Sequence, residues 1–330
     1  MADRPIMIID GMNFFIRFFC ANPTMDSNGE LVGGVIGFIK AITALVKTNK
    51  PEQVYIIWEA GGSQRRRAIY PEYKKGRKPP RTNRTYGDVI PDTEENRAYQ
   101  IVVLTKMLRC LPVCQVYVEK CEADDIIGYL CNEKFSGREK IIVSSDKDFY
   151  QLLDETTRMW SPGKRIFYTA DSVTKEYNIS PNNFATARAF DGDKSDNIPG
   201  VERVGLKTLA KKFDLVGEDV TVDEIIEISK EEAQKKKPLK IHENISKSED
   251  LVKRNYKLMK LNSSMLSLGQ IVQTNDIIDD FIPRCSKLKF LRRYMKYSLT
   301  GIDCDNVCTS LYPLVLQHKE EEKKEEEESE

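Results

Sequence analysis

The chain has 330 residues, of which 40% are hydrophobic and 31% are charged, so it is long enough for one large domain or two modest ones around a sizeable core. It contains no apolar run of about 18 residues, and its start "MADRPIMIIDG" lacks the zones of a secretory signal, so we expect a cytoplasmic protein without membrane contact. Its 51 basic and 51 acidic residues cancel to a net charge of zero, but this neutral total hides strong local charge.

Eight cysteines are scattered along the chain, which fits a reducing compartment better than a disulfide framework. Cys110 and Cys114, like Cys304 and Cys308, have three residues between them. A structural zinc site is one interpretation of these pairs, and small buried side chains are the interpretation that we favour. If the protein binds a metal, its carboxylates are the expected ligands, which favours magnesium or manganese over zinc.

Short apolar runs that each end at an acid alternate with segments of helix length. The runs are residues 6–9 before Asp10, 54–58 before Glu59, and 140–146, which ends at Asp146. Continuous apolar strands are typical of a parallel sheet that is covered on both faces. We expect helices at about 33–49, 93–110 and 123–135. This alternation predicts an α/β domain whose acids meet at the carboxyl edge of the sheet, where ligands of such sheets bind.

Residues 60–92 are too long and too basic for an ordinary connection between two such elements. Nine cations lie between Gln64 and Arg84, against the single acid Glu72, and Tyr70 and Tyr73 interleave with them. We predict a lid or arch over the active edge that binds an anionic polymer and is only partly ordered in the free protein.

The character of the chain changes after Pro181. Residues 181–213 predict two short helices around a glycine-rich turn, and residues 218–260 predict charged helices, with a mobile loop at 233–250. Residues 286–317 predict further helices, and the glutamate-rich residues 319–330 predict a disordered tail.

Nine acids lie at predicted strand ends, helix starts or the glycine-rich turn: Asp10, Glu59, Glu122, Asp124, Asp125, Asp146, Asp148, Asp193 and Asp196. Taken singly, "DKD" fits a solvated turn and "EADD" fits acids that a helix dipole stabilises. In an extended segment, Asp146 and Asp148 point the same way. Together the nine place so much negative charge on one rim that two magnesium ions are the natural counterions, which predicts metal-assisted phosphodiester hydrolysis.

The stretch "GVERVG" (200–205) before Lys207 admits two interpretations. It fits an ordinary connection with a surface lysine, and it fits a phosphate-binding turn whose backbone amides approach an anion. Because Asp193 and Asp196 come just before it, we favour a clamp on a duplex backbone that does not read sequence.

At these residues the chain resembles the structure-specific 5′-nuclease family, which comprises flap endonucleases, the 5′-to-3′ exonuclease domains of bacterial polymerases, and phage 5′-nucleases such as the phage enzyme called ribonuclease H. The matching motifs occur in order over about the first two thirds of the chain. They are "IIDGMNFFIR" (8–17), "YPEYKKGRKP" (70–79), "CEADDIIGYL" (121–130), "IIVSSDKDFYQLL" (141–153) and "GDKSDNIPGVERVGLKTLAKKF" (192–213). The length and the divergent C-terminal third favour a phage-type member.

The resemblance implies a PIN-like nuclease domain over 1–180, with helices on both faces of a parallel sheet and a basic arch at 60–92. It also implies a helical DNA-binding part over 181–318, with a helix-three-turn-helix at 185–213. The implied activity is cleavage near single-strand/duplex junctions at DNA 5′ ends, including 5′ flaps and RNA/DNA primers. A replication protein, such as a single-strand binding protein or a clamp, is an expected further partner of a monomeric enzyme.

The resemblance also assigns residues. Eight of the nine acids, all except Glu59, become metal ligands for two Mg²⁺ ions, which Mn²⁺ can replace, with Asp10 and Asp146 in the catalytic set. We add Glu59 to the expected metal ligands because its longer side chain can still reach a metal or its water. Lys74 and Arg77 become the catalytic cations of the arch. Potassium is expected at the helix-three-turn-helix. The implied DNA contacts are Arg65, Arg66, Tyr73, Lys74, Lys75, Arg77, Lys78, Gly200, Arg203, Gly205, Lys207 and Thr208.

Two positions depart from the family pattern. Glu59 in "WEA" stands where the family usually has aspartate, and Arg203 stands where its clamp usually has a glycine. Arginine at that position is strained if the turn needs a positive φ, or else it adds a phosphate contact. The alternative function that Glu59 raises is a DNA-junction binding protein of the same fold that has lost catalysis.

Overall fold

The computed structural model describes residues 4–59, 61–77 and 94–319. The far part of the predicted arch, including Lys78, and nearly all of the acidic tail lie outside these residues.

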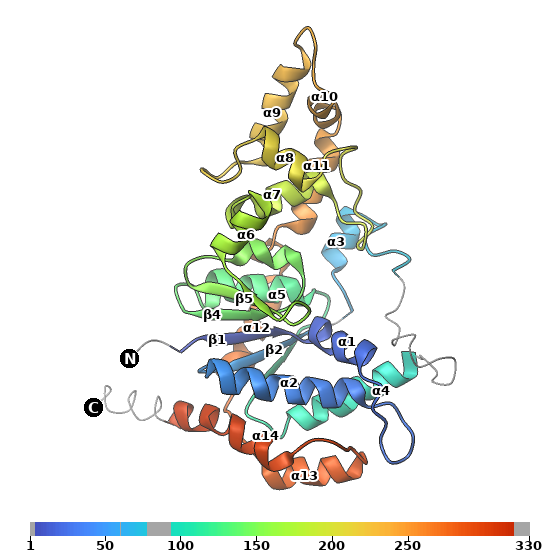
Figure 1. The fold of residues 1–330 in the computed structure, drawn as a ribbon, viewed down its shortest axis with the longest axis vertical. Coiled ribbons are helices and arrows are strands. Elements are labelled where there is room, and N and C mark those ends of the chain that lie inside the picture. The colour runs from blue at the N-terminus through green and yellow to red at the C-terminus, as the bar shows by residue number, and fades with distance from the viewer. Residues whose placement is uncertain (1–3, 60, 78–93, 320–330) are drawn as a thin grey trace, which may run out of the picture.

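A six-stranded sheet forms the centre of the molecule (Figure 1). Its order is β3-β2-β1-β4-β5-β6, and all neighbouring strands are parallel except β5 and β6. The strands are β1 (Ile6–Asp10), β2 (Val54–Trp58), β3 (Cys114–Tyr117), β4 (Lys140–Val143), β5 (Thr157–Ser161) and β6 (Ile166–Tyr168). The three predicted strands are confirmed. The other three lack a long apolar run, so nothing in their sequence set them apart from loops.

Alternate residues of each central strand face two separate cores. Ile8 and Ile57 belong to one apolar cluster, and Ile9 and Ile56 belong to the other. All four are completely buried. This two-sided burial explains why the strands read as continuous apolar runs rather than as alternating ones.

Helices cover both faces, as predicted. On one face lie α1 (Gly11–Ala21), α2 (Gly33–Asn49) and α4 (Glu94–Leu108). On the other lie α5 (Ala123–Tyr129), which continues as a π-helical turn (Leu130–Lys134), and α12 (Leu268–Asp279). The predicted helices at 33–49, 93–110 and 123–135 are therefore confirmed.

A second group of helices lies beyond β5 and β6, at the top of Figure 1. It comprises α6 (Ala170–Tyr177), α7 (Pro181–Asp191), α8 (Leu206–Lys212), α9 (Val222–Ala233), α10 (Lys240–Ser246) and α11 (Glu249–Met259). The expected mobile loop at 233–250 is wrong where α10 forms. Ile245 on this helix is fully buried, and α10 packs along α9, so tertiary contacts order a segment that its lysines had marked as a loop.

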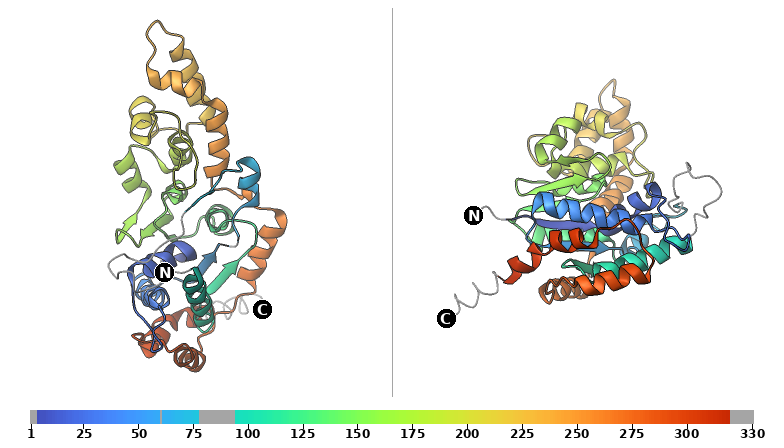
Figure 2. Two further views of the ribbon diagram at one scale, coloured as in Figure 1. Left: turned by 90° about the vertical axis from the view of Figure 1, so that its right-hand side faces the viewer. Right: turned by 60° about the horizontal axis from the view of Figure 1, so that its bottom comes forward.

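The last helices return to the sheet. α13 (Lys287–Lys296) packs against α4, and α14 (Cys304–Leu311) packs against α2, at the end of the molecule opposite α9 and α10 (Figure 2). Phe290 and Leu311 are fully buried in the same apolar cluster as Ile9. This part of the predicted 181–318 unit therefore completes the core of the nuclease domain. No helix in the described ranges is long and apolar enough to cross a bilayer.

Candidate active site

One pocket of about 590 Å³ opens at the carboxyl edge of the sheet. Acids from six segments line it, and three of these segments are the ends of the parallel strands β1, β2 and β4, which meet at the same edge of the sheet. Its charged lining is completed by two cations of the arch base (the described residues 61–77 of the predicted arch), Lys74 and Arg77, and by Glu94 and Arg97 of α4. The predicted site residues in the lining are Asp10, Glu59, Lys74, Arg77, Glu122, Asp124, Asp146, Asp193 and Asp196.

Asp10 is held rigidly where β1 becomes α1. It is the N-cap of α1, and one carboxylate oxygen accepts a hydrogen bond from the Asn13 amide at 3.1 Å. The other oxygen accepts from the Ser144 hydroxyl at 3.1 Å. The same hydroxyl oxygen accepts from the Asp146 amide, also at 3.1 Å. Ser144 therefore couples the ends of β1 and β4.

Asp146 and Asp148 point different ways, so the expectation that they point together is wrong. Their segment is a 3₁₀ turn (Lys147–Leu152) rather than an extended strand, and Asp146 caps it by accepting from the Asp148 amide at 3.0 Å. Asp146 lines the pocket. Asp148 instead accepts a hydrogen bond from Nε of Arg188, on α7, at 3.0 Å.

The turn after α7 brings Asp193 and Asp196 to the pocket. Asp193 accepts hydrogen bonds from the amide and hydroxyl of Ser195, both at 2.7 Å. The backbone carbonyl of Asp196 accepts from the Lys74 amide at 2.9 Å, and the Asp196 carboxylate lies 3.7 Å from Arg77. The arch base and the start of the predicted clamp are thus joined directly.

The three acids of "EADD" (122–125) make different contacts. Glu122 is the N-cap of α5, and its carboxylate lies 3.0 Å from Nζ of Lys74 and accepts from the Tyr73 hydroxyl at 2.8 Å. Asp124 lines the pocket. Asp125 points away from it and accepts two hydrogen bonds from Arg66, at 2.5 and 2.7 Å.

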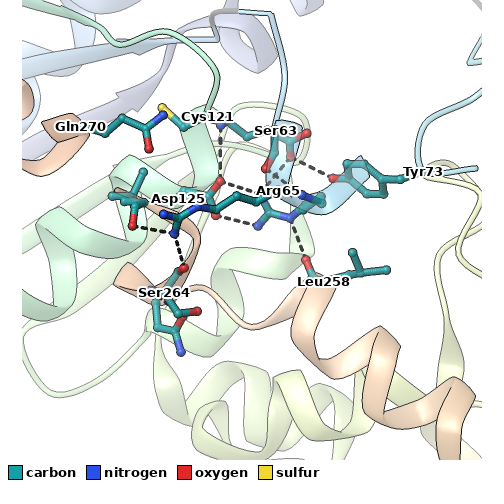
Figure 3. Close-up of polar contacts among 12 residues, drawn as sticks. Ser63, Arg65, Tyr73, Cys121, Asp125, Leu258, Ser264 and Gln270 are labelled. Carbon is teal, nitrogen blue, oxygen red and sulfur yellow. Dashed lines mark hydrogen bonds and ion pairs between the residues drawn. The ribbon is translucent and has the colours of Figure 1, made fainter. Parts of the chain in front are cut away.

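The structure thus places Arg66, a predicted DNA contact, and Asp125, a predicted metal ligand, in a buried ion pair with each other. Their side chains are 2% and 0% exposed. Nε of Arg66 also donates to the Leu258 carbonyl at 2.8 Å, so a single guanidinium joins α3 (Gln64–Ile69), α5 and α11, as Figure 3 shows around Asp125 and Leu258. Within this pair, the guanidinium supplies the positive charge that burial of the carboxylate requires.

Other predicted DNA contacts at the arch base are also engaged within the protein. Arg65 is exposed, but its guanidinium donates to the carbonyls of Ser264 and Leu266 at 2.7 and 2.8 Å (Figure 3). Tyr73 is buried, so its ring cannot stack on an unpaired base without a rearrangement of this segment. Lys75 is exposed and pairs with Glu72.

The glycine-rich turn (200–205) has both a glycine that no other residue can replace and, at Arg203, the positive φ that the sequence analysis considered. Gly200 lies so close to the Asp191 carbonyl oxygen that an added Cβ would approach it to 2.1 Å, so no other residue fits. Arg203 has φ +61°, the left-handed region that favours glycine. Its side chain is exposed, like that of Lys207, whereas Gly205 and Thr208 at the start of α8 are half-buried.

Burial and mutual repulsion raise the pKa values of several of these acids. Burial raises the pKa of Asp10 to about 7, and the negative charges of Asp146 and Glu59 add to the shift. The pKa of Asp124 is well above its usual value for the same reason, with Asp146 and Asp10 as the nearby charges. This part of the pocket therefore carries more negative charge than the protein itself compensates.

At Glu122 and Asp148, nearby cations of the protein oppose the rise in pKa that burial causes. Burial raises the pKa of Glu122, but Lys74 and Arg66 outweigh this effect and hold it below its usual value. Burial raises the pKa of Asp148 to about 6, with Arg188 acting in the opposite direction. The acids in and next to the pocket thus differ in how far the protein's own cations compensate their charge.

Comparison with known proteins decides the family. The family model described as "5′-3′ exonuclease, N-terminal resolvase-like domain" matches residues 5–178, more than half of the chain. The chain belongs to the 5′-3′ exonuclease family. It is a phosphodiester hydrolase with 5′-nuclease activity on DNA, and the predicted PIN-like α/β fold with a helical C-terminal part is confirmed.

Relatives of this exonuclease occur as separate enzymes and within polymerases. It is 31% identical over 265 residues to a 5′-3′ exonuclease of Aquifex aeolicus, and the aligned region covers 79% of this chain and 83% of the relative. It is 30% identical over 242 residues to DNA polymerase I of Bacillus subtilis, which covers 71% of this chain and 26% of the polymerase.

Among solved structures, a bacteriophage T5 flap endonuclease in a pseudo-enzyme–product complex with DNA and metal ions shares the fold. The TM-score is 0.65 at 22% identity, and the match covers 84% of this chain and 98% of that chain.

The donor set of this exonuclease fits hard divalent cations. Carboxylates supply most of the side-chain oxygens at the pocket, and one of these oxygens, Oε1 of Glu122, is buried with no hydrogen-bond partner among the described residues. Within those residues, no three acidic, histidine or cysteine side chains already form a closed ligand set. Lys74 and Arg188 hold Glu122 and Asp148 as their own counterions, so carboxylates would have to turn toward an entering ion.

Sequence reasoning missed several residues of the site, among them Glu94, Arg97, Ser144 and Arg188. Ser144 lies beside the predicted strand end, so its proximity to the acids was a usable signal. Arg188 and Arg97 lie on helices and have no motif around them that distinguishes them from surface cations. Their contribution depends on how α7 and α4 pack.

Proposed function

We propose that this protein is a divalent-metal-dependent 5′-nuclease that cleaves DNA at or near 5′ ends and at 5′-flap junctions, and that removes RNA/DNA primers during replication. One observation carries the proposal. Acids from the ends of β1, β2 and β4, the start of α5 and the turn after α7 line one pocket together with Lys74 and Arg77. Carboxylates beside two cations suit phosphoryl transfer, in which negative charge must be neutralised as a bond breaks.

The proposed metal ligands are the predicted acids that line the pocket, together with Asp148. They are Asp10, Glu59, Glu122, Asp124, Asp146, Asp148, Asp193 and Asp196. Two Mg²⁺ ions suit a set made only of carboxylates, and Mn²⁺ is expected to replace them. When bound, such ions acidify a water molecule and neutralise charge on the phosphate. Asp125 is left out of this proposed set because Arg66 binds both of its oxygens. Glu59 remains in it because it lines the pocket.

The protein's own cations have distinct proposed tasks. Lys74 is held at the pocket wall by Glu122, at 3.0 Å, so its ammonium is positioned before substrate arrives. Arg77 is 55% exposed and lies 3.7 Å from Asp196, so its guanidinium can turn toward a phosphate. We assign to this pair the stabilisation of charge that develops on the scissile phosphate.

The turn from Gly200 to Thr208 is the proposed duplex clamp. Arg203 and Lys207 are exposed, and their turn directly follows the pocket acids Asp193 and Asp196 in the chain, so contacts with the DNA backbone would place a junction near the acids. Potassium at this turn, a replication-protein partner, the monomeric state and cytoplasmic location stay predictions. The alternative of a binding protein without catalysis gains no support, because Glu59 is present at the pocket.

A 5′-labelled flap substrate tests the proposal. We expect magnesium-dependent release of short products, and product sizes with free and blocked 5′ ends will separate threading of the 5′ end from binding at the junction. Asp146→Asn should abolish turnover and keep DNA affinity, because the clamp and arch cations remain. The absence of cleavage with either magnesium or manganese would refute this function.

A further inference from the structure

Arg188, on α7, lies near the pocket, and its guanidinium makes hydrogen bonds to several groups of the protein. Its side chain is 11% exposed. Nε donates to Asp148 at 3.0 Å, one terminal nitrogen donates to Asp193 at 2.5 Å, and the other donates to the Gly192 carbonyl at 2.8 Å and to Asp191 at 3.3 Å. Four of the five N–H groups of an arginine are thereby used.

The two carboxylates that Arg188 joins come from different parts of the fold. Asp148 belongs to the 3₁₀ turn after β4, whereas Asp193 follows α7 and leads into the proposed clamp. A planar guanidinium can bind both at defined angles, which the single ammonium of a lysine cannot do. This side chain therefore adds a direct link between the two carboxylates to the packing of α7 against the 3₁₀ turn, and it fixes how Asp193 faces Asp148.

These contacts leave one oxygen of the Asp148 and Asp193 carboxylates without a hydrogen bond among the described residues. Arg188 binds Oδ1 of Asp148, and no hydrogen bond to Oδ2 is found among the described residues. On Asp193 it binds Oδ2, while Oδ1 accepts from Ser195. Because Arg188 is largely buried and nearly saturated with partners, a direct contact with substrate is not its role.

We propose that Arg188 is a positioning residue that orients Asp148 and Asp193 as ligands for one of the two divalent ions. This inference rests on the proposed metal-dependent function. It differs from a competing role in which Arg188 merely occupies the place of an ion, because removal of a competitor would strengthen metal binding. Removal of a positioning residue weakens it, typically about 10- to 100-fold for partners that orient ligands.

Calorimetric titration of the full-length protein with MgCl₂, without DNA, tests the inference. We expect two ions to bind the wild type, and one of them to bind Arg188→Ala at least about 10-fold more weakly. Arg188→Lys, which keeps the charge but loses the planar fork, should show most of the same loss. Arg158→Ala is the matched control, since Arg158 is exposed on β5 and lies against Phe167.

A second readout separates positioning from a general structural role. Half-maximal flap cleavage by Arg188→Lys should need about 10-fold more magnesium, with the rate recovering at saturating magnesium. Binding of flap DNA in EDTA should be unchanged. Magnesium binding by Arg188→Ala and Arg188→Lys that is equal to or tighter than wild type would overturn the inference. A wild type that binds no magnesium would overturn the proposed function, and this inference with it.

Discussion

At the scale of single residues, the pocket concentrates charge that the protein compensates unevenly. Lys74 and Arg66 hold Glu122 ionised, whereas Asp10 and Asp124 have raised pKa values because they are buried near other acids. This uneven balance has consequences for stability that can be measured without metal.

Asp10→Asn should make the metal-free protein more stable at neutral pH. The folded state holds the Asp10 proton up to about pH 7, whereas an unfolded aspartate releases it near pH 3.8. The unfolded state therefore releases a proton across this window, and the free energy of unfolding falls as pH rises through it. Asparagine removes this dependence and still caps α1.

We expect the stability gain of Asp10→Asn, measured by urea unfolding in EDTA, to be small at pH 4, to grow up to about pH 7, and to level off above it. Asp171→Asn, at an exposed position of α6, is the control. A gain that is the same at pH 4 and pH 8 would show that the burial of an ionised Asp10 is not what costs stability.

Arg203 presents a second question at this scale, because its left-handed backbone and its exposed charge have opposite effects. Arg203→Gly should raise the free energy of unfolding by about 1 kcal/mol, since glycine adopts this φ without strain. Arg203→Ala keeps the strain and should not stabilise. Both variants should bind flap DNA more weakly, with a salt dependence reduced by about one phosphate contact. Unchanged DNA affinity in both would assign strain alone to Arg203.

At the scale of elements, the base of the arch is part of the packed protein. α3 is short, and it is held by the ion pair of Arg66 with Asp125, by the Leu258 carbonyl, and by the Tyr73 hydroxyl against Glu122. These bonds tie the segment that carries Lys74 to the helix start that carries the pocket acids. The orientation of Lys74 is thus coupled to α5 and α11.

Arg66→Ala should therefore destabilise the protein by about 3–5 kcal/mol, because it leaves Asp125 buried without a counterion. Arg67→Ala is the matched control on the next residue, which is exposed, and should change stability by less than about 0.5 kcal/mol. Urea unfolding monitors both. Equal, small effects would mean that Asp125 does not depend on the ion pair. The double variant Arg66→Met/Asp125→Leu should recover much of the loss.

At the scale of the whole molecule, the chain returns to its first core after building the second group of helices. Phe290 on α13 and Leu311 on α14 belong to the same apolar cluster as residues of β1 and β2, more than 200 residues earlier in the chain, and reach it through α4 and α2. The core on this face of the sheet is therefore incomplete without the C-terminal helices.

Phe290→Ala should lower the free energy of unfolding of the nuclease sheet by about 3–5 kcal/mol, because it opens a cavity at a position that is completely buried. Leu288→Ala on the same helix is the control, since Leu288 is 59% exposed and should change stability little. Denaturant unfolding followed at Trp58, in the same cluster, measures both. A loss at Phe290 that leaves the Trp58 transition unchanged would show that α13 unfolds separately.

Much of the active edge could be predicted from local pattern. The apolar runs that end at Asp10, Glu59 and Asp146 identify three strands, and parallel strands bring such ends together whatever the loops do. The acids at the start of α5 and before the glycine-rich turn were predicted from their own local sequence, as helix-start acids and as acids that precede a phosphate-binding turn. The positive φ at Arg203 was one of two interpretations that the sequence left open.

Other features depend on partners that are distant in the chain. The sequence "EADD" by itself placed several carboxylates at a helix start, but only packing against α3 directs Asp125 to Arg66 while Asp124 faces the pocket. The basic run by itself predicted a cationic arch, but tertiary contacts decided that Arg66 and Tyr73 are buried. Sequence alone thus determined where charge gathers. The tertiary structure decided which charges neutralise one another and which remain uncompensated in the pocket, because that choice depends on burial and on atoms brought close by folding.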